Sequence, residues 1–359
     1  MSSESIPKTQ RAAVVTEFKK PYEIKNDHPV TQPSDLKPGQ CLVKLEYSGF
    51  CHSDVHVKDN DWGAGAKLPL VGGHEGIGKI VAIGEGTYAS KVKVGDRVGL
   101  KWFANACLRC EMCRTGWETC CGVARTTVHG HLVDGTFQEY AVSYTDYVSP
   151  IPEGLDPAEA APLLCAGLTV YRAIKQSNAK AGQWIAITGA GGGLGHLAVQ
   201  FAVHKGLRVI AIDTGAEKKE LCTKLGAERW VDFKETENIV QDVMQAADGL
   251  GPHAAVIAAA HPQPFNDAVG YLRVTGTLVA VGMPAGGASL NIPIVLLVAK
   301  VLNIVGTATG TQQDMEEALQ LAKAGKIRCK ADVRKLEDIN EVIDDMMKGN
   351  VNGRIVLKI

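Results

Sequence analysis

Four cysteines lie close together in the stretch CLRCEMCRTGWETCC. Three of them follow one another at three-residue steps and the fourth closes the set after a short polar loop: Cys107, Cys110, Cys113 and Cys121. Thiolates this close repel each other, and a divalent cation removes the repulsion. Zinc accepts four sulfurs in a tetrahedron and keeps no open position. The spacing therefore predicts a structural zinc site, with the neighbouring Cys120 as a competitor for the fourth place.

The charge and the cysteine content restrict the class of protein. The chain has 359 residues and a formal net charge of −1, which disfavours nucleic acid as a partner. The start MSSESIPKTQR lacks the pattern of a signal peptide or a transit peptide. Ten cysteines without an export signal favour metal ligation over disulfides. The longest apolar run, 292–305, is interrupted by Lys300 and Asn303 and is too short to span a bilayer. We therefore expect a cytoplasmic protein with no membrane partner.

The pattern of apolar residues changes near residue 166. Before it, short β-like runs such as QCLVKLEYSGFC and GKIVAIGEG are broken by Gly and Pro, which predicts an antiparallel, barrel-like domain. After it, buried strands such as WIAITGA and RVIAID alternate with helical spacing, which predicts a doubly wound parallel sheet. The strand-like end RIVLKI is expected to return to the first domain. We predict an α/β chain with domains 1–165, completed by 310–359, and 166–309.

The turn GAGGGLG, residues 189–195, lies between a predicted strand and a predicted helix. Glycines let the backbone approach a pyrophosphate at the helix N-terminus, although Ala190 stands where a strict GxGxxG would begin. Asp213 follows at the end of the next strand, where a carboxylate accepts from the adenosine ribose and repels a 2′-phosphate. The sequence thus predicts NAD rather than NADP, with Lys218 beside the same ribose. A plain βα turn and a helix-capping Asp213 are the alternatives.

Three further residues are candidates for a second, catalytic zinc. Cys51 lies in GFCHSD, His74 in GGHEG and Cys165 in LLCAGLT. Three protein ligands and one exchangeable water are typical of a catalytic zinc, which polarises an alcohol or carbonyl oxygen. Cys165 alone is more often a small buried apolar residue, and His74 alone also fits a satisfied loop histidine. Spacing does not join three such distant positions.

With these motifs in view, the chain resembles the zinc-dependent medium-chain alcohol dehydrogenases, most closely the yeast and fungal ethanol-active branch. The resemblance runs from about residue 12 to 358 and is carried by GFCHSD, GGHEGIG, the four-cysteine lobe, LLCAGLTVY and GAGGGLG with Asp213. It implies a GroES-like β-rich catalytic domain and a Rossmann NAD-binding domain. It implies two zinc ions per chain and the reversible oxidation of an alcohol to an aldehyde or ketone with NAD.

The resemblance also implies roles for individual residues. Cys51, His74 and Cys165 hold the catalytic zinc, Glu75 lies behind the metal as an exchangeable ligand, and Asp54 orients His74. Ser53 and His56 form a proton relay. The cofactor-binding residues implied by the motifs are His52, Gly192, Gly193, Leu194, Gly195, Asp213, Lys218, Phe233, Val281 and Arg354, with Thr307 and Thr309 on a segment lining the cofactor cleft.

Substrate size is implied by bulky residues that match the family's pocket. Trp62 and Trp102 correspond to two tryptophans that narrow it, and Met283 to a further wall. Two indoles leave room for a short chain, which predicts short primary and some secondary alcohols. The small residues in DWGAGAKLPL and the missing aromatic in GTATGTQ are departures that enlarge the pocket. Packing at a domain edge is the alternative role of the tryptophans.

Two other functions stay open at this stage. One is a reductase of a bulkier aldehyde in a biosynthetic pathway. The other is a non-catalytic NAD- or zinc-binding protein on the same fold, which the retained proton relay disfavours. The small-molecule partner is an alcohol or aldehyde. The resemblance implies a homotetramer, with 292–305 as an interface segment.

Overall fold

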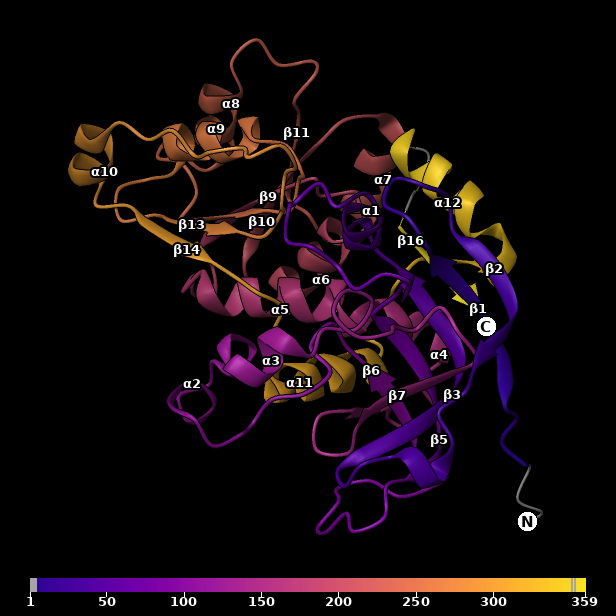
Figure 1. Cartoon of the computed structure of the whole chain (residues 1–359). Coiled ribbons are helices and arrows are strands. Elements are labelled where there is room, and N and C mark those ends of the chain that lie inside the picture. The colour runs from indigo at the N-terminus through magenta and orange to yellow at the C-terminus, as the bar shows by residue number, and fades with distance from the viewer. Residues whose placement is uncertain (1–4, 350, 352) are drawn as a thin grey trace. The chain divides into compact units, whose positions relative to one another are not determined.

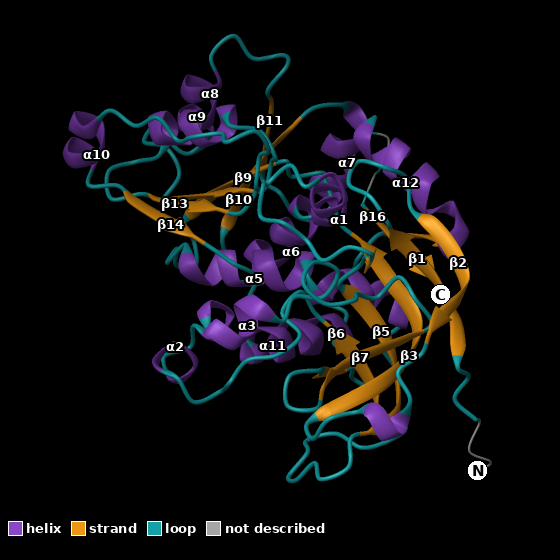
Figure 2. Ribbon diagram, viewed as in Figure 1, coloured by secondary structure: helices purple, strands orange, loops and turns teal. Residues whose placement is uncertain are grey.

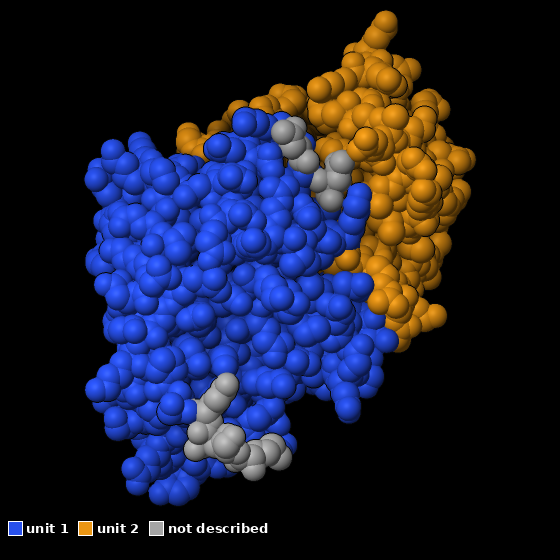
Figure 3. Space-filling model, turned by 90° about the vertical axis from the view of Figure 1, so that its right-hand side faces the viewer, with its two compact units in different colours: residues 1–165, 311–323, 330–359 blue, residues 166–310, 324–329 orange. Residues whose placement is uncertain are grey.

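The computed structural model describes residues 5–349, 351 and 353–359. Residues 1–4, on which part of the leader expectation rests, and residues 350 and 352 of the predicted tail lie outside it. The chain forms two compact units, coloured separately in Figure 3. The first comprises 1–165, 311–323 and 330–359, and the second 166–310 and 324–329. No helix in the described residues is long and apolar enough to cross a membrane.

The first unit is built on an antiparallel sheet in the order β15-β16-β3-β5-β6-β8, with β7 paired to β3; only β15 and β16 run parallel. The last strand of the chain thus pairs with β3, as Figure 2 shows. A smaller sheet has the order β2-β1-β4. The strands are β1 (Thr9–Val15), β2 (Glu23–Pro29), β3 (Gln40–Phe50), β4 (Leu70–Val71), β5 (Glu75–Ile83), β6 (Arg97–Leu100), β7 (Tyr140–Tyr144), β8 (Ser149–Pro150), β15 (Ala331–Lys335) and β16 (Arg354–Lys358).

Apolar residues alternate along these strands and meet inside the sheet. Val43, Ile80, Val98 and Ala141 belong to one buried cluster that joins four neighbouring strands. Helices connect the strands, and the first of them carries His52, Ser53, Asp54 and His56. They are α1 (His52–Asp59), α2 (Glu111–Arg114), α3 (Gly122–Thr126), α4 (Pro157–Ala160), α11 (Gln312–Lys323) and α12 (Ile339–Met347).

The second unit is a parallel sheet in the order β11-β10-β9-β12-β13-β14. Helices α5 and α6 lie on one face of it, and α8 and α9 on the other (Figure 1). Its strands are β9 (Trp184–Thr188), β10 (Arg208–Asp213), β11 (Arg229–Asp232), β12 (Ala254–Ile257), β13 (Thr277–Ala280) and β14 (Asn303–Gly306). Its helices are α5 (Ala166–Gln176), α6 (Gly195–His204), α7 (Ala216–Lys224), α8 (Ile239–Ala246), α9 (Gln263–Tyr271) and α10 (Ile294–Lys300).

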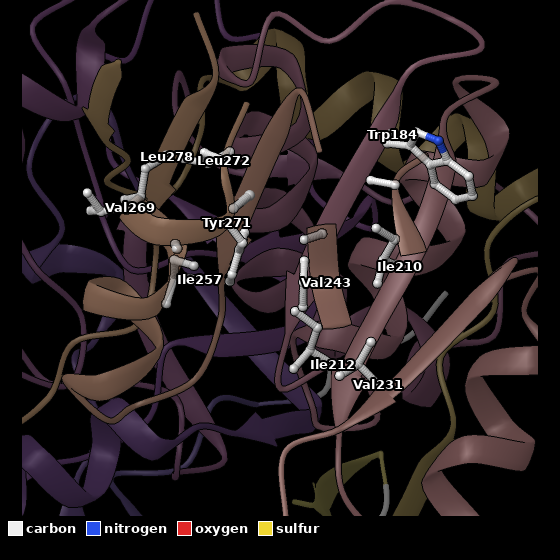
Figure 4. Packing of buried hydrophobic residues seen from close by; sticks show 14 of the residues in the cluster. Trp184, Ile210, Ile212, Val231, Val243, Ile257, Val269, Tyr271, Leu272 and Leu278 are labelled. Atoms are coloured by element: carbon white, nitrogen blue, oxygen red, sulfur yellow. The ribbon is translucent and has the colours of Figure 1, made fainter. Parts of the chain in front are cut away.

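The four central strands of this sheet, β9, β10, β12 and β13, are buried on both faces, which explains their continuous apolar runs. Ile210, Ile257 and Leu278 pack against Val243 of α8 and Tyr271 of α9 (Figure 4). After β9, the chain adds β10 and β11 on one side of that strand. It then returns and adds β12 on the other side of β9. Ligands of open α/β sheets bind at the carboxyl ends of the strands at such a reversal. The predicted α/β fold, with a β-rich unit and a doubly wound unit, is confirmed.

Candidate active site

One buried carboxylate organises the first candidate site. Asp54 Oδ2 accepts the backbone N–H of Cys51 at 2.9 Å, which closes the first turn of α1. Its other oxygen, Oδ1, lies 2.9 Å from His74 Nδ1. A carboxylate only accepts, so His74 donates through Nδ1, and in the neutral ring the lone pair is on Nε2. Asp54 therefore holds Cys51 by its backbone and His74 by its imidazole ring, although the two residues come from different motifs.

The lone pair of His74 points into a group of potential metal ligands. His74 Nε2 is buried and has no hydrogen-bond partner among the described residues. One ligand atom from each of Cys51, His74, Glu75 and Cys165 lies within 4.8 Å of the others. A buried nitrogen without a partner is costly unless something binds it. Two sulfurs and one imidazole nitrogen are donors that zinc prefers, so these residues fit a zinc ion.

Glu75 is held at this group by an arginine. Arg354 Nη2 donates to Glu75 Oε2 at 2.6 Å, and both side chains are buried. The carboxylate reaches this place because residue 49 is glycine: a Cβ there would lie 1.9 Å from Glu75 Oε2. Burial raises the pKa of Glu75 to about 7 against the attraction of Arg354. The Arg354 guanidinium is thus engaged inside the first unit, and its predicted contact with a pyrophosphate stays a prediction.

The two thiols of the group differ in acidity. The hydrogen bond with Cys165 lowers the pKa of Cys51 well below its ordinary value, although burial opposes this, and His74 and Arg354 act in the same direction. The same hydrogen bond, with burial, raises the pKa of Cys165 well above its ordinary value. Burial opposes protonation of His74, but the Asp54 carboxylate raises its pKa well above the ordinary value. A thiolate is thus already favoured where zinc needs one.

Aromatic rings and the predicted relay residues surround this group. Trp102 packs edge-on against His74, with ring centroids 4.7 Å apart. Ser53 Oγ lies 3.7 Å from Cys51 Sγ. Trp62 stacks on His56 at 4.6 Å, and His52 lies 4.8 Å from the same ring. The structure therefore brings together the residues from GFCHSD and GGHEG with Cys165 and Trp102.

Sequence reasoning missed one residue here. Asp61 places both carboxylate oxygens 2.8 Å from His56 Nδ1. The spacing of five residues carries little signal, because a helix continuing from His56 would turn residue 61 away. The signal lies in Asn60, which takes a left-handed conformation with φ 51° and ends α1. Asparagine tolerates that conformation better than most residues.

The four-cysteine lobe forms the second group of potential ligands. Sulfur atoms of Cys107, Cys110, Cys113 and Cys121 lie within 4.8 Å of one another. Backbone N–H groups of Cys110 and Cys107 donate to Cys107 Sγ at 3.3 Å and Cys121 Sγ at 3.4 Å. Backbone hydrogen bonds lower the pKa of Cys107, and against the effect of burial they lower that of Cys121 to about 6. Cys121, and not Cys120, completes the set, and four sulfurs fit a closed zinc site.

In the second unit, the glycine turn joins β9 to α6. A Cβ on residue 195 would lie 2.0 Å from the Gly189 carbonyl oxygen, so the tight strand–helix turn requires Gly195. Asp213 at the end of β10 accepts the Gly191 N–H at 2.9 Å and pairs with Lys218 Nζ at 3.1 Å. The Phe233 N–H donates to the Asp213 carbonyl at 3.2 Å. These residues cluster at the carboxyl edge of the sheet, and the arrangement fits a dinucleotide.

Other predicted cofactor residues of the second unit follow the same edge. Leu194 precedes α6, and Gly192 and Gly193 lie in the turn before it. Val281 follows β13 and is buried, whereas Met283 is exposed. Thr307 follows β14 and donates its N–H to the Ala280 carbonyl at 3.1 Å. Within the second unit, the structure therefore groups the residues taken from four separate motifs.

Comparisons with known proteins agree with this geometry. Residues 37–153 match the alcohol dehydrogenase GroES-like domain, and residues 193–324 match the zinc-binding dehydrogenase family. The chain is 45% identical to an alcohol dehydrogenase of Geobacillus stearothermophilus, covering 97% of this chain and 99% of that protein. It is 42% identical to alcohol dehydrogenase 1 of Neurospora crassa, covering 99% of each. The structure of acetophenone reductase from Geotrichum candidum in complex with NAD is similar, with a TM-score of 0.87 and 27% identity, and covers 99% of this chain and 98% of that one.

Proposed function

The chain belongs to the zinc-dependent medium-chain alcohol dehydrogenases, and on that premise we propose that it oxidises short primary and some secondary alcohols reversibly with NAD. The observation that carries the site assignment is the buried, unpartnered His74 Nε2 among the ligand atoms of Cys51, Glu75 and Cys165, with Trp102 against its ring. A structural zinc site closed by protein ligands binds no substrate, so it does not need an aromatic side chain against its imidazole ligand. We assign 1–165 with 310–359 as the catalytic domain and 166–309 as the NAD-binding domain.

The chain's own residues supply binding, orientation and proton transfer. Cys51, His74 and Cys165 hold the catalytic zinc, with Glu75 as the exchangeable fourth residue, and the four-cysteine lobe holds the structural zinc. When bound, zinc supplies Lewis acidity toward the alcohol oxygen and NAD accepts the hydride. Asp54 fixes the tautomer and direction of His74. Ser53, beside Cys51, takes the hydroxyl proton of the alcohol, and His56 receives it farther along the relay.

The second unit determines which dinucleotide binds. Gly192, Gly193, Leu194 and Gly195 let the pyrophosphate approach the start of α6, while Asp213 and Lys218 contact the adenosine ribose. The remaining contacts that we assign to NAD are His52, Phe233, Val281, Arg354, Thr307 and Thr309. Asp213 is supported in this role by its position at the end of β10 beside the Gly191 N–H. Its negative charge disfavours the 2′-phosphate of NADP.

Substrate size follows from bulky side chains, of which Trp102 packs against His74. We assign Trp62, Trp102 and Met283 to the substrate pocket. Indole rings leave little room for large substrates, so short unbranched alcohols are favoured, and one methylene changes discrimination between substrates by roughly 1–3 kcal/mol.

An opposing observation supports a second candidate, the reduction of a bulkier carbonyl compound. Residues 63–66 are small, and Gly63 and Gly65 have open space where a Cβ would stand. The Geotrichum relative is named for reducing a ketone that carries a ring.

The experiment that tests this function measures NADH formation with ethanol, propanol, branched alcohols and benzyl alcohol. We expect kcat/KM to be highest for a short unbranched alcohol. Trp102→Ala should move the optimum to longer or branched alcohols by at least about tenfold in relative kcat/KM and leave the Kd for NAD nearly unchanged. A preference of the unmutated enzyme for benzyl or branched alcohols would favour the second candidate. No NADH with any alcohol would contradict the proposal.

We further infer a cytoplasmic homotetramer. An exposed apolar surface on α10, formed by Ile294, Val295 and Val298, continues onto Val301 and to β14, the edge strand of the sheet. Exposed apolar patches and free strand edges favour association. Sedimentation analysis should give about four times the chain's 38.2 kDa. A concentration-independent monomer would contradict this inference.

A further inference from the structure

We propose that Asp61 is a positioning residue for proton transfer, which holds His56 in the tautomer that accepts a proton through Nε2. The inference rests on the proposed relay and deepens it. It identifies a carboxylate outside the motifs that carry the family resemblance. This carboxylate determines which nitrogen of His56 accepts the proton. The carboxylate acts on the imidazole alone and does not touch the alcohol.

The geometry between the two side chains defines the tautomer. Both Oδ1 and Oδ2 of Asp61 lie 2.8 Å from His56 Nδ1. An ionised carboxylate has no proton to give, so the imidazole donates from Nδ1. The lone pair of the neutral ring is then on Nε2. A carboxylate at this distance also stabilises the imidazolium that forms when Nε2 accepts a proton.

The turn after α1 is built to return Asp61 to His56. Asn60 ends the helix in the left-handed region, and its N–H donates to the Val57 carbonyl at 3.1 Å. The Asp61 N–H donates to the His56 carbonyl at 3.3 Å, and Asn60 Oδ1 accepts the Gly65 N–H at 3.1 Å. Backbone and side chain of Asp61 are thus both tied to the same histidine. An exposed carboxylate at a loop tip would lack this second attachment.

Two neighbouring rings restrain the ring of His56 as well. Trp62 stacks on it at 4.6 Å with an angle of 29° between the planes, and His52 lies 4.8 Å away on the preceding helical turn. Two titratable groups contact the ring, Asp61 and His52. A ring flip would put the Cδ2–H of His56 in place of Nδ1 and so lose the hydrogen bond to the carboxylate. The observed orientation is held by that hydrogen bond and by the stacking with Trp62 together.

The Asp61 side chain is more exposed to solvent than the His56 side chain, so exposure increases from the ring toward the carboxylate. The His56 side chain is 9% exposed and that of Asp61 is 32% exposed. During oxidation, the proton from the alcohol forms a bond to Nε2, and the imidazolium then releases one proton to water, which restores the neutral ring. A buried imidazole that accepts a proton needs a negatively charged neighbour, and water must reach that neighbour. Asp61 is a carboxylate with a partly exposed side chain, so it meets both conditions.

The test is a double-mutant cycle with ethanol and NAD, recorded as kcat/KM from pH 6 to 10. Asp61→Asn should lower the plateau of kcat/KM about tenfold, because the ring loses the carboxylate that fixes its tautomer. Asp61→Glu should recover most of the rate. In a His56→Gln background, the further change Asp61→Asn should alter kcat/KM less than about twofold.

Asp96→Asn is the matched control, because Asp96 pairs with a lysine in another turn and its side chain is 29% exposed. It removes the same charge and should leave the pH profile unchanged. An Asp61→Asn enzyme with the wild-type profile beside an impaired His56→Gln enzyme would overturn the role of Asp61 alone. So would an equal loss from Asp61→Asn with and without His56. A His56→Gln enzyme at the wild-type rate would overturn the relay itself.

Discussion

The four-cysteine lobe and the Cys51 group use the same sulfur ligand in opposite surroundings. The lobe offers four sulfurs on one partly exposed loop, where backbone N–H groups donate to two of them. The Cys51 group combines two sulfurs with an imidazole and a carboxylate that are fully buried, next to Trp102. Four strong ligands close a zinc site, whereas three with a displaceable fourth leave a position for substrate. The donor set, rather than the metal, thus separates structure from catalysis.

The largest effect that separates the two groups is expected from Cys51→Ser. Loss of a zinc ligand removes Lewis acidity worth several kcal/mol in the transition state, so kcat/KM should fall by at least about a thousandfold. The thermal midpoint should change by a few degrees only, because α1 keeps its Asp54 cap. Steady-state NADH formation and a thermal melt of the same sample measure both. Activity within tenfold of wild type would remove Cys51 from the catalytic site.

The matched substitution in the lobe is Cys110→Ser, with the reverse pattern expected. Removal of one ligand opens the closed site, and structural zinc contributes folding free energy directly. The thermal midpoint should fall by at least about 5 °C, while freshly purified protein keeps kcat/KM within about threefold. Zinc analysis of the folded fraction should show which ion was lost. A stable variant without activity would place the lobe in the reaction.

A substitution away from both groups sharpens the comparison. Asp213→Gly should narrow the preference for NAD over NADP, which we expect to be about tenfold or more in the unmutated enzyme, since a carboxylate facing a 2′-phosphate costs at least ~1.4 kcal/mol. Zinc content should stay at two equivalents. The ratio of kcat/KM for the two cofactors measures the effect. Equal ratios before and after substitution would show that Asp213 does not contact the ribose.

The smallest expected effect concerns a residue that connects the two regions. Lys101 precedes Trp102, and its buried ammonium donates to the Tyr147 carbonyl at 2.7 Å, while Tyr147 packs against Cys121 of the lobe. Burial lowers the pKa of Lys101 to about 7 from an ordinary 10.5, against the attraction of Glu118. Between these values the unfolded chain binds a proton that the folded chain does not, so stability rises with pH.

Lys101→Met should remove this rise. We expect the gain in free energy of unfolding between pH 7 and pH 9 to be smaller by roughly 1–3 kcal/mol than in the unmutated protein. Urea unfolding at several pH values measures it, with Lys93→Met as the control, since that lysine is 84% exposed. An unchanged dependence on pH would mean that Lys101 stays charged in the folded chain.

The sequence could predict residue types better than it could predict their assembly. Spacing alone identified the lobe, because Cys107, Cys110 and Cys113 are neighbours in the chain. The choice of Cys121 over Cys120 needed coordinates, since adjacent residues point in different directions. Cys51, His74 and Cys165 were joined through a family resemblance, because the long-range pairing of β3 with β5 that brings Cys51 near His74 leaves no local signal.

Hydrogen-bond partners were the least predictable part of the site. Apolar runs predicted the parallel sheet, since buried strands need continuous apolar residues. The Arg354–Glu75 pair joins the last strand to the metal ligands and depends on a glycine at position 49. The Asp61–His56 pair depends on the left-handed Asn60. Both require a backbone conformation that composition and periodicity do not report.

The most direct test of the division between the two groups is stepwise chelation. Purified protein is dialysed against increasing concentrations of a chelator, and zinc content, NADH formation and the thermal midpoint are measured on each sample. We predict two equivalents of zinc per chain at the start, because two donor sets fit the ion. Activity should disappear with the first equivalent released, whereas the thermal midpoint should fall only with the second. Activity that persists until the second equivalent leaves, or a starting content of one, would contradict the account.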